Sequence, residues 1–206
     1  YTALLKSNGI KVVHVVSSAK FALKAQDAGC DAVVAEGFEA GGHNGREETT
    51  TMVLIPCVSK AVDIPVIAAG GIATGRQMLA ALVLGASAVQ IGSRFVASVE
   101  ASCHNNFKNA VIDAIEGETM LSLKALTPVR LLKNNFYQQV QQAESICASK
   151  EQLEELLGRG RAKKGMFEGN MDDGELEIGQ VSSMINNIKP AAEILNEIWM
   201  EYNDLL

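Results

Sequence analysis

The 206-residue sequence predicts an α/β fold in which parallel strands alternate with helices. Three observations support this class. Short runs rich in Val, Ile and Ala recur along about the first hundred residues, helical stretches of about a dozen residues separate them, and the runs are apolar throughout. Continuously apolar strands separated by helices are typical of parallel βαβ units, whose sheet is covered on both faces.

The expected elements follow in order from the N-terminus. A first helix ends at Gly9, because glycine is a common helix stop. Strands are expected at residues 11–16, 31–36, 65–71 and 86–93, and the last of these is apolar enough to be buried on both faces. Helices are expected between them, at residues 18–29, 49–62 and 73–85, where apolar residues recur at helical spacing.

The positions of glycines and polar residues separate two folds that share this rhythm. A Rossmann-like open sheet and a (β/α)8 barrel both fit it. Here such residues follow the ends of successive strands, at Glu36 and Gly37, at Gly70 and Gly71, and at Gln90, Gly92 and Ser93. Because barrel active sites are built at the C-terminal ends of the strands, we predict that residues 1–100 are the last four βα units of a TIM barrel.

Four strands are half of the eight that a TIM barrel requires. A parallel sheet of four strands would leave two open, apolar edges, which favour aggregation. We therefore expect the first four strands to lie on a preceding segment or on another chain. Four further parallel strands within residues 100–206 would contradict this expectation.

Residues 101–206 are expected to form a helical extension that packs on the barrel mouth. Residues 100–116 and 118–166 have the pattern of helices with polar faces, and a loop with the sequence DDGELEIGQ precedes a final amphipathic helical region. No strand signal comparable to those of the first hundred residues is present.

Composition excludes several classes of function. A formal net charge of −6 gives no electrostatic reason to expect nucleic acid, and the one basic cluster, at Arg159, Arg161, Lys163 and Lys164, is interpreted as a solvated loop or helix end. The four cysteines lack a C-x-x-C pattern and are expected to be free thiols of a cytoplasmic protein. No apolar run is long enough to cross a membrane.

The most informative stretch is AEGFEAGGHNG, residues 35–45, which places His43 within a glycine cluster. Glycines such as Gly41 and Gly42 allow a backbone to approach a flat or phosphorylated ligand closely. A histidine in such a loop is a candidate acid, base or hydrogen-bond donor near neutral pH. The alternative is a loop histidine with a purely structural role.

Two further loops predict a phosphate site. Gly70 and Gly71 end one strand, Gly92 and Ser93 end the next, and each pair precedes a helix whose first N–H groups are unpaired. Loops after the last two strands of a barrel are the usual phosphate-binding place of that fold. The alternative for each pair is an ordinary tight turn.

Glu36 and Gln90 are candidate ligand contacts at strand ends. The Glu36 carboxylate could bind a ring nitrogen or a ribose of a ligand, or could form an ion pair with Arg46. The Gln90 side chain could bind a ligand or could fill a position in the barrel interior. Motifs for Ser-His-Asp chemistry, for zinc and for a P-loop are absent, so no metal is expected. A phosphorylated cofactor with its own reactivity fits better.

These residues identify a family. The chain resembles the flavin-dependent nitronate monooxygenase (2-nitropropane dioxygenase) family, which includes the FMN-dependent enoyl-acyl-carrier-protein reductase II. The resemblance is carried by EGFEAGGHNG, by PVIAAGGIATGRQMLAALVLGASAVQIGSRF, by Glu100 with His104 and Lys108, and by the late pair Gly179 and Gln180. The resemblance implies a TIM barrel that binds FMN. Positions matching the FMN contacts of the family are Glu36, Gly41, Gly42, Gly70, Gly71, Gln90, Ile91, Gly92, Ser93, Gly179 and Gln180.

The resemblance also implies a reaction. His43 matches the histidine beside the reactive face of the flavin, and the A-E-G sequence at Glu36 and the long stretch 130–174 are similar to the reductase branch. The implied activity is NADH- or NADPH-dependent reduction of trans-2-enoyl thioesters carried by acyl carrier protein in fatty acid synthesis, by a homodimer or other homo-oligomer. The alternatives are a nitronate monooxygenase and a non-catalytic degenerate barrel.

Overall fold

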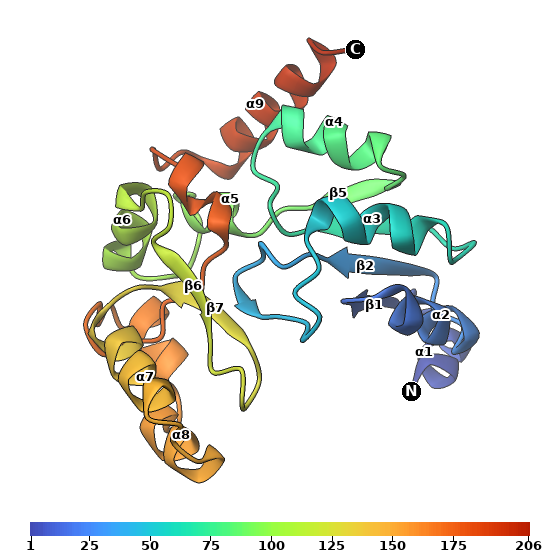
Figure 1. The fold of residues 1–206 in the computed structure, drawn as a ribbon. Coiled ribbons are helices and arrows are strands. Elements are labelled where there is room, and N and C mark those ends of the chain that lie inside the picture. The colour runs from blue at the N-terminus through green and yellow to red at the C-terminus, as the bar shows by residue number, and fades with distance from the viewer. The chain divides into compact units, whose positions relative to one another are not determined.

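A parallel sheet in the order β1-β2-β4-β5 lies at the centre of the first of two structural units (Figure 1). The computed structural model describes residues 1–206. The first unit comprises residues 1–39, 45–91 and 197–206, and the second comprises residues 40–44 and 92–196. Each unit is described by itself.

The first unit alternates strands and helices as predicted. Its strands are β1 (Val13–Val16), β2 (Ala32–Glu36), β4 (Val66–Ala69) and β5 (Ala88–Gln90), all paired in parallel. Its helices are α1 (Thr2–Ser7), α2 (Ala19–Asp27), α3 (Thr51–Ser59), α4 (Gly75–Val83) and the C-terminal part of α9 (Ala191–Asn203). Side-chain oxygens of Ser18 and Thr74 cap the N-termini of α2 and α4.

The core of this unit explains the apolar strands. Val33, Ala35 and Ala68 of the central strands pack with Leu54 and Ile55 of α3. Burial of this apolar surface is the main favourable contribution to the stability of such a layer. The expected burial of the last strand on both faces is wrong for β5, whose residues are exposed or half-buried because it is an edge strand of the sheet.

The second unit contains an antiparallel sheet in the order β3-β7-β6. Its strands are β3 (Gly42–His43), β6 (Thr119–Ser122) and β7 (Val129–Leu132). Its helices are α5 (Ser93–Val96), α6 (Asn105–Asp113), α7 (Asn135–Ser145) and α8 (Lys150–Leu157), with a π-helical turn η1 (Lys163–Phe167) and a 3-10 turn η2 (Gln180–Met184). Val111, Leu132, Leu176 and Ile178 are part of its core.

The strands β6 and β7 correct the prediction of helix over residues 118–166. They form a hairpin, and β7 is central in its sheet, so that all four of its residues are buried. Four-residue strands carry too little periodicity to be separated from helix by pattern alone. Both strands are antiparallel and belong to a separate sheet, so residues 101–206 do not supply four further parallel strands.

None of the helices is long and apolar enough to cross a membrane.

Candidate functional site

In the first unit, the predicted site residues lie at one end of the parallel sheet. Glu36, the last residue of β2, is in register with Ala69 of β4, and Ala69 is in register with Gln90 of β5. The predicted residues Gly70 and Ile91 follow directly in the chain. The carboxyl ends of these strands therefore form one row, as expected for a parallel sheet.

Glu36 is a half-buried carboxyl group without a partner in the chain. It forms no hydrogen bond or ion pair, so the alternative of an ion pair with Arg46 is wrong. Its burial raises the pKa of the carboxyl above the usual value. Buried polar groups normally find a partner, so Glu36 is a candidate for binding a ligand.

The loop after β4 presents free backbone N–H groups. Gly70 and Gly71 have φ of +88° and +71°, a conformation that favours glycine. Their N–H groups find no acceptor in the chain. The Thr51 hydroxyl donates to the Gly70 carbonyl oxygen at 2.9 Å, and Glu39 accepts from the Thr51 N–H at 3.0 Å. The loop is thus fixed through the carbonyl oxygen of Gly70, while the N–H groups of Gly70 and Gly71 remain available to a ligand.

In the second unit, the structure brings Gly41, Ser93 and Gly179 together. A Cβ at Gly41 would lie 2.4 Å from the carbonyl carbon of Ile178 and 2.5 Å from the nitrogen of Gly179. The Gly179 N–H donates to Ser93 Oγ at 3.0 Å. Gly92 precedes Ser93 and is exposed, with nothing within 4 Å of the position of a Cβ. The late loop at Gly179 therefore packs against the glycine cluster at Gly41.

His43 is the second residue of β3 and pairs with Val129 of β7. Its side chain is exposed and makes no hydrogen bond within the chain. The preceding Gly42 has φ of +74° and is in register with the buried Arg130. The imidazole is thus held on a short strand and remains accessible.

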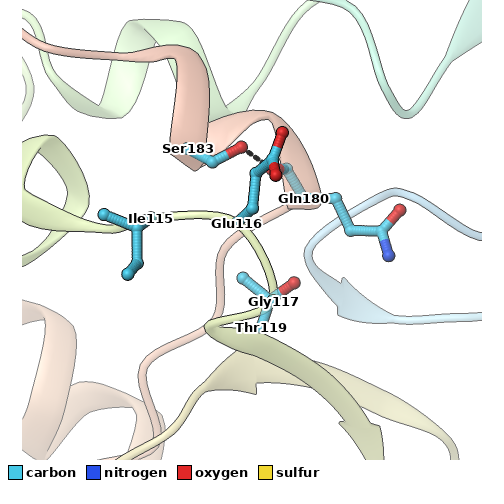
Figure 2. Close-up of a pocket in the computed structure, with 6 residues that line it drawn as sticks. All are labelled: Ile115, Glu116, Gly117, Thr119, Gln180 and Ser183. Atoms are coloured by element: carbon cyan, nitrogen blue, oxygen red, sulfur yellow. Dashed lines mark hydrogen bonds between the residues drawn. The ribbon is translucent and has the colours of Figure 1, made fainter.

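Gln180 opens η2 and lines a cavity of about 210 Å³ (Figure 2). The other lining residues are Ile115, Glu116, Gly117, Thr119 and Ser183. Within η2, Ser183 Oγ donates to the Gln180 carbonyl oxygen at 3.1 Å. The amide of Gln180 is exposed at this cavity, so it is free to contact a ligand.

Two acidic residues of the segment that follows Gly174 escaped the sequence prediction. Glu175 is 6% exposed, and burial together with the neighbouring Glu177 raises its pKa to about 7. Burial also raises the pKa of Glu177, whereas the charge of His43 lowers it. The alternating polar and apolar residues of E-L-E in the sequence DDGELEIGQ could have indicated an extended segment at this point of the chain.

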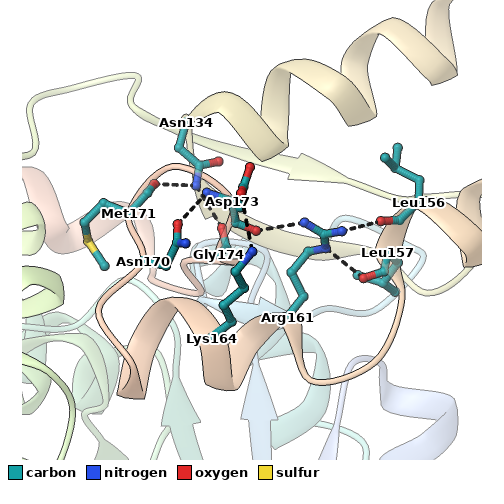
Figure 3. Close-up of polar contacts among 9 residues, drawn as sticks. All are labelled: Asn134, Leu156, Leu157, Arg161, Lys164, Asn170, Met171, Asp173 and Gly174. Atoms are coloured by element: carbon teal, nitrogen blue, oxygen red, sulfur yellow. Dashed lines mark hydrogen bonds and ion pairs between the residues drawn. The ribbon is translucent and has the colours of Figure 1, made fainter.

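The interpretation of the basic cluster as solvated is wrong for Arg161. Its guanidinium donates at 2.8 Å to the carbonyl oxygens of Leu156, Leu157 and Asp173 (Figure 3). It also stacks over the Phe136 ring, 4.4 Å from the centroid. A guanidinium has enough donors to satisfy several carbonyls at once, and here it ties the end of α8 to the segment that leads into Glu175.

Comparisons with known proteins agree on one family. The family model described as nitronate monooxygenase matches residues 2–201. A probable nitronate monooxygenase of Staphylococcus saprophyticus is 32% identical over 93% of this chain and 59% of its own length. The chain thus spans about three fifths of that curated relative.

Two solved structures resemble the chain over 98% of its length. FabK from Thermotoga maritima is 44% identical with a TM-score of 0.92, and the match covers 63% of that protein. Nitroalkane oxidase from Streptomyces ansochromogenes is 30% identical with a TM-score of 0.81, and the match covers 60% of it.

Proposed function

The chain belongs to the nitronate monooxygenase family, and from this membership we propose that it is part of a flavin-dependent oxidoreductase that binds FMN. The observation that carries the cofactor proposal is Glu36, a half-buried carboxyl without a partner in register with Ala69 and Gln90. Such a group suits the N–H of a ring or the hydroxyl of a ribityl chain. When bound, FMN would supply hydride transfer.

Four of the remaining predicted contacts are suited to the phosphate of this cofactor. The free N–H groups of Gly70 and Gly71 are suited to an anion. Gly92 leaves open space at its Cβ position, and the N–H groups of Gly92 and Ser93 have no acceptor in the chain. We assign these four residues to phosphate binding, and Gly41, Gly42, Ile91, Gly179 and Gln180 to further contacts.

The finer fold assignment belongs to the same proposal. The four βα units are the last four of a TIM barrel, and the first four come from a part of the protein outside residues 1–206. Support comes from β1, where Val13 and Val15 are 48% and 50% exposed on an edge strand. A neighbouring strand of the completed barrel would cover these apolar side chains.

The proposed reaction is NADH- or NADPH-dependent reduction of trans-2-enoyl thioesters carried by acyl carrier protein. It is supported by the 44% identity to FabK, the enoyl-acyl-carrier-protein reductase II, against 30% to the nitroalkane oxidase. The role of His43 is to contact the nucleotide or the substrate, since its imidazole is exposed and free of hydrogen bonds within the chain.

Nitronate monooxygenase activity is the second candidate. The family model and the curated relatives carry that name. In this reaction His43 would act as the base that takes a proton from a nitroalkane or orients its nitronate. A cofactor-free barrel that only binds a ligand is the third candidate.

The deciding experiment is anaerobic rapid mixing of the complete protein. A flavin absorbance band in the purified protein excludes the cofactor-free barrel. Flavin reduction by NADH or NADPH followed by reoxidation with crotonyl thioester supports the reductase, whereas indifference to both nucleotides with turnover of alkyl nitronates supports the monooxygenase. In whichever of the two reactions the protein catalyses, the His43→Ala variant should retain FMN and lower turnover by about 10²-fold. His104→Asn, which preserves the cap of α6, serves as the control.

A further inference from the structure

Three residues that carry the family resemblance, Glu100, His104 and Lys108, make contacts in the second unit that the proposed function does not use. Glu100 Oε2 accepts from the Ala191 N–H at 2.8 Å, at the start of α9. The His104 side chain caps α6, because it accepts from the Asn106 N–H at 3.1 Å. Lys108 lies within α6, and its side chain reaches the segment that follows α5.

The Lys108 ammonium is buried without a carboxylate partner. The residue is 4% exposed, and its Nζ donates to the carbonyl oxygens of Ser98 at 2.7 Å and Val99 at 3.1 Å. An ammonium group has three N–H donors, and this one makes no ion pair and no further hydrogen bond within the chain. Lysines are almost never this buried unless they are paired. The two carbonyl contacts are therefore the feature to explain.

Backbone hydrogen bonds connect these carbonyls to the start of α5. The Ser98 N–H donates to the carbonyl oxygen of Phe95 at 3.1 Å, and the Phe95 N–H donates to that of Gly92 at 2.9 Å. Gly92 directly precedes Ser93, the first residue of α5. Lys108 thus holds the far end of a continuous hydrogen-bonded segment that begins at Gly92.

This segment has occupied carbonyl groups at its end and available N–H groups at its start. A second buried cation, Arg94, is 8% exposed and donates to the Ala97 carbonyl oxygen at 3.5 Å and to Asn187 Oδ1 at 2.7 Å. The N–H groups of Gly92 and Ser93 have no acceptor in the chain. Successive unpaired backbone N–H groups that are held in place are suited to an anion.

We propose that Lys108 is a positioning residue for the phosphate of the cofactor. Its ammonium fixes the carbonyl oxygens of Ser98 and Val99. The segment held in this way presents the N–H groups of Gly92 and Ser93 to the phosphate. This inference rests on the proposed function, which assigns those two residues to phosphate binding. Because Lys108 acts through the backbone at the phosphate, it contributes to the affinity for FMN and not to that for riboflavin.

The ratio of the two flavin affinities tests the proposal, because riboflavin is the same flavin without the phosphate. Flavin fluorescence titration of the complete protein, freed of cofactor, gives both Kd values. Lys108→Met should weaken FMN binding at least about 10-fold and change riboflavin binding less than about twofold. The control is Val111→Ala, which opens a cavity at a fully buried residue of the same helix. It should lower the free energy of unfolding and leave the ratio of affinities within about twofold.

Two outcomes of the titration overturn the inference. Equal losses of FMN and riboflavin affinity in Lys108→Met would show a merely structural role, and unchanged FMN affinity would show no role. Lys108→Gln, which is neutral and keeps an N–H donor, serves if the Met variant does not fold, and the same selective loss is expected. A wild-type protein that binds FMN no more tightly than riboflavin would instead refute the phosphate assignment of the proposed function, and the inference with it.

Amide hydrogen exchange tests the positioning without any flavin. In the cofactor-free protein, the N–H groups of Phe95 and Ser98 should exchange at least about 10-fold faster in Lys108→Met than in the wild type. The amides of α7, in the same unit, should keep their rates. Val111→Ala should not accelerate Phe95 and Ser98 relative to α7. Unchanged exchange at these two amides in a folded Lys108 variant overturns the inference.

Discussion

The Thr51 hydroxyl donates a hydrogen bond to the carbonyl oxygen of Gly70 at 2.9 Å, joining the first residue of α3 to the loop after β4. Thr51 is 9% exposed, and its hydroxyl also contacts Glu39 Oε2 at 3.0 Å. The Thr51 side chain thus links the Glu39 carboxylate to the glycines that are proposed to bind phosphate. The conformation of that loop depends on a residue outside it.

Thr51→Val should therefore affect both stability and cofactor binding. The hydroxyl is lost while the shape is kept, and the Gly70 carbonyl loses its donor, so the free energy of unfolding should fall by about 1 to 2 kcal/mol. FMN affinity should fall by about 10-fold as the loop loses its support. The matched control is Thr50→Val, because the exposed Thr50 side chain makes no cap hydrogen bond. Denaturant unfolding and flavin fluorescence titration measure the two effects, and equal losses in both variants would contradict the assignment.

Glu36 should make FMN binding depend on pH. Burial raises the pKa of the free carboxyl above 4.5, and a cofactor N–H or O–H that donates to the carboxylate binds the ionised form better. Affinity should then increase as the pH rises above 4.5 through the pKa of Glu36, and level off once the carboxyl is ionised. Glu36→Gln should bind FMN with a flat profile in this range. A wild-type profile that is equally flat would remove Glu36 from the cofactor site.

Gly92 allows the fold and the ligand to be tested separately. A Cβ at Gly92 would have nothing of the protein within 4 Å, so Gly92→Val should retain the melting temperature of the apoprotein while FMN affinity falls at least about 10-fold. Gly41→Val is the contrasting variant, because its Cβ would collide with the backbone of Ile178 and Gly179; it should fail to fold. Calorimetry with flavin titration distinguishes them, and full FMN affinity in Gly92→Val would refute the phosphate assignment.

Glu175 should make the protein less stable as the pH rises. Its pKa is raised from 4.5 to about 7, so the folded state holds the proton more tightly than the unfolded state. The resulting stabilisation is complete below pH 4.5 and is lost as the pH rises to 7, with a change on the order of 2 kcal/mol. Glu175→Gln cannot ionise and should lack this contribution. Urea unfolding at several pH values measures it; the same slope in both proteins would show that Glu175 ionises normally.

Arg161 should not be replaceable by lysine. The guanidinium satisfies three carbonyl oxygens and stacks on Phe136, a geometry that an ammonium group does not reproduce. We expect Arg161→Lys to lower the free energy of unfolding by about 2 to 3 kcal/mol. Arg159→Lys, at an exposed residue two positions away, should change it by less than about 0.5 kcal/mol. Similar small effects for both would restore the interpretation of a solvated cluster.

The residues that sequence reasoning placed correctly owe their positions to local chemistry. Ala32–Glu36 and Val66–Ala69 are buried strands whose apolar runs end at a polar residue or a glycine. Such runs are visible without knowing any partner, and so is the glycine at position 71, where φ is positive. The row of Glu36, Ala69 and Gln90 then follows from parallel pairing.

What the sequence left open depends on contacts between distant segments. The hairpin of β6 and β7 has strands of four residues, too short for a clear pattern. Glu177 acquires its place from pairing with Leu131, and Arg161 from carbonyls of Leu156, Leu157 and Asp173. None of these partners is marked in the composition of the segments themselves.

The pairing of β3 with β7 also has a consequence for the order of folding. The hairpin of β6 and β7 closes over a short stretch of chain, whereas pairing of Gly42 with Arg130 joins segments far apart in the sequence and costs much more chain entropy. We therefore expect the hairpin to form first and the strand that carries His43 to dock onto it later. That strand is expected to reach its final position only in a chain whose hairpin is already formed.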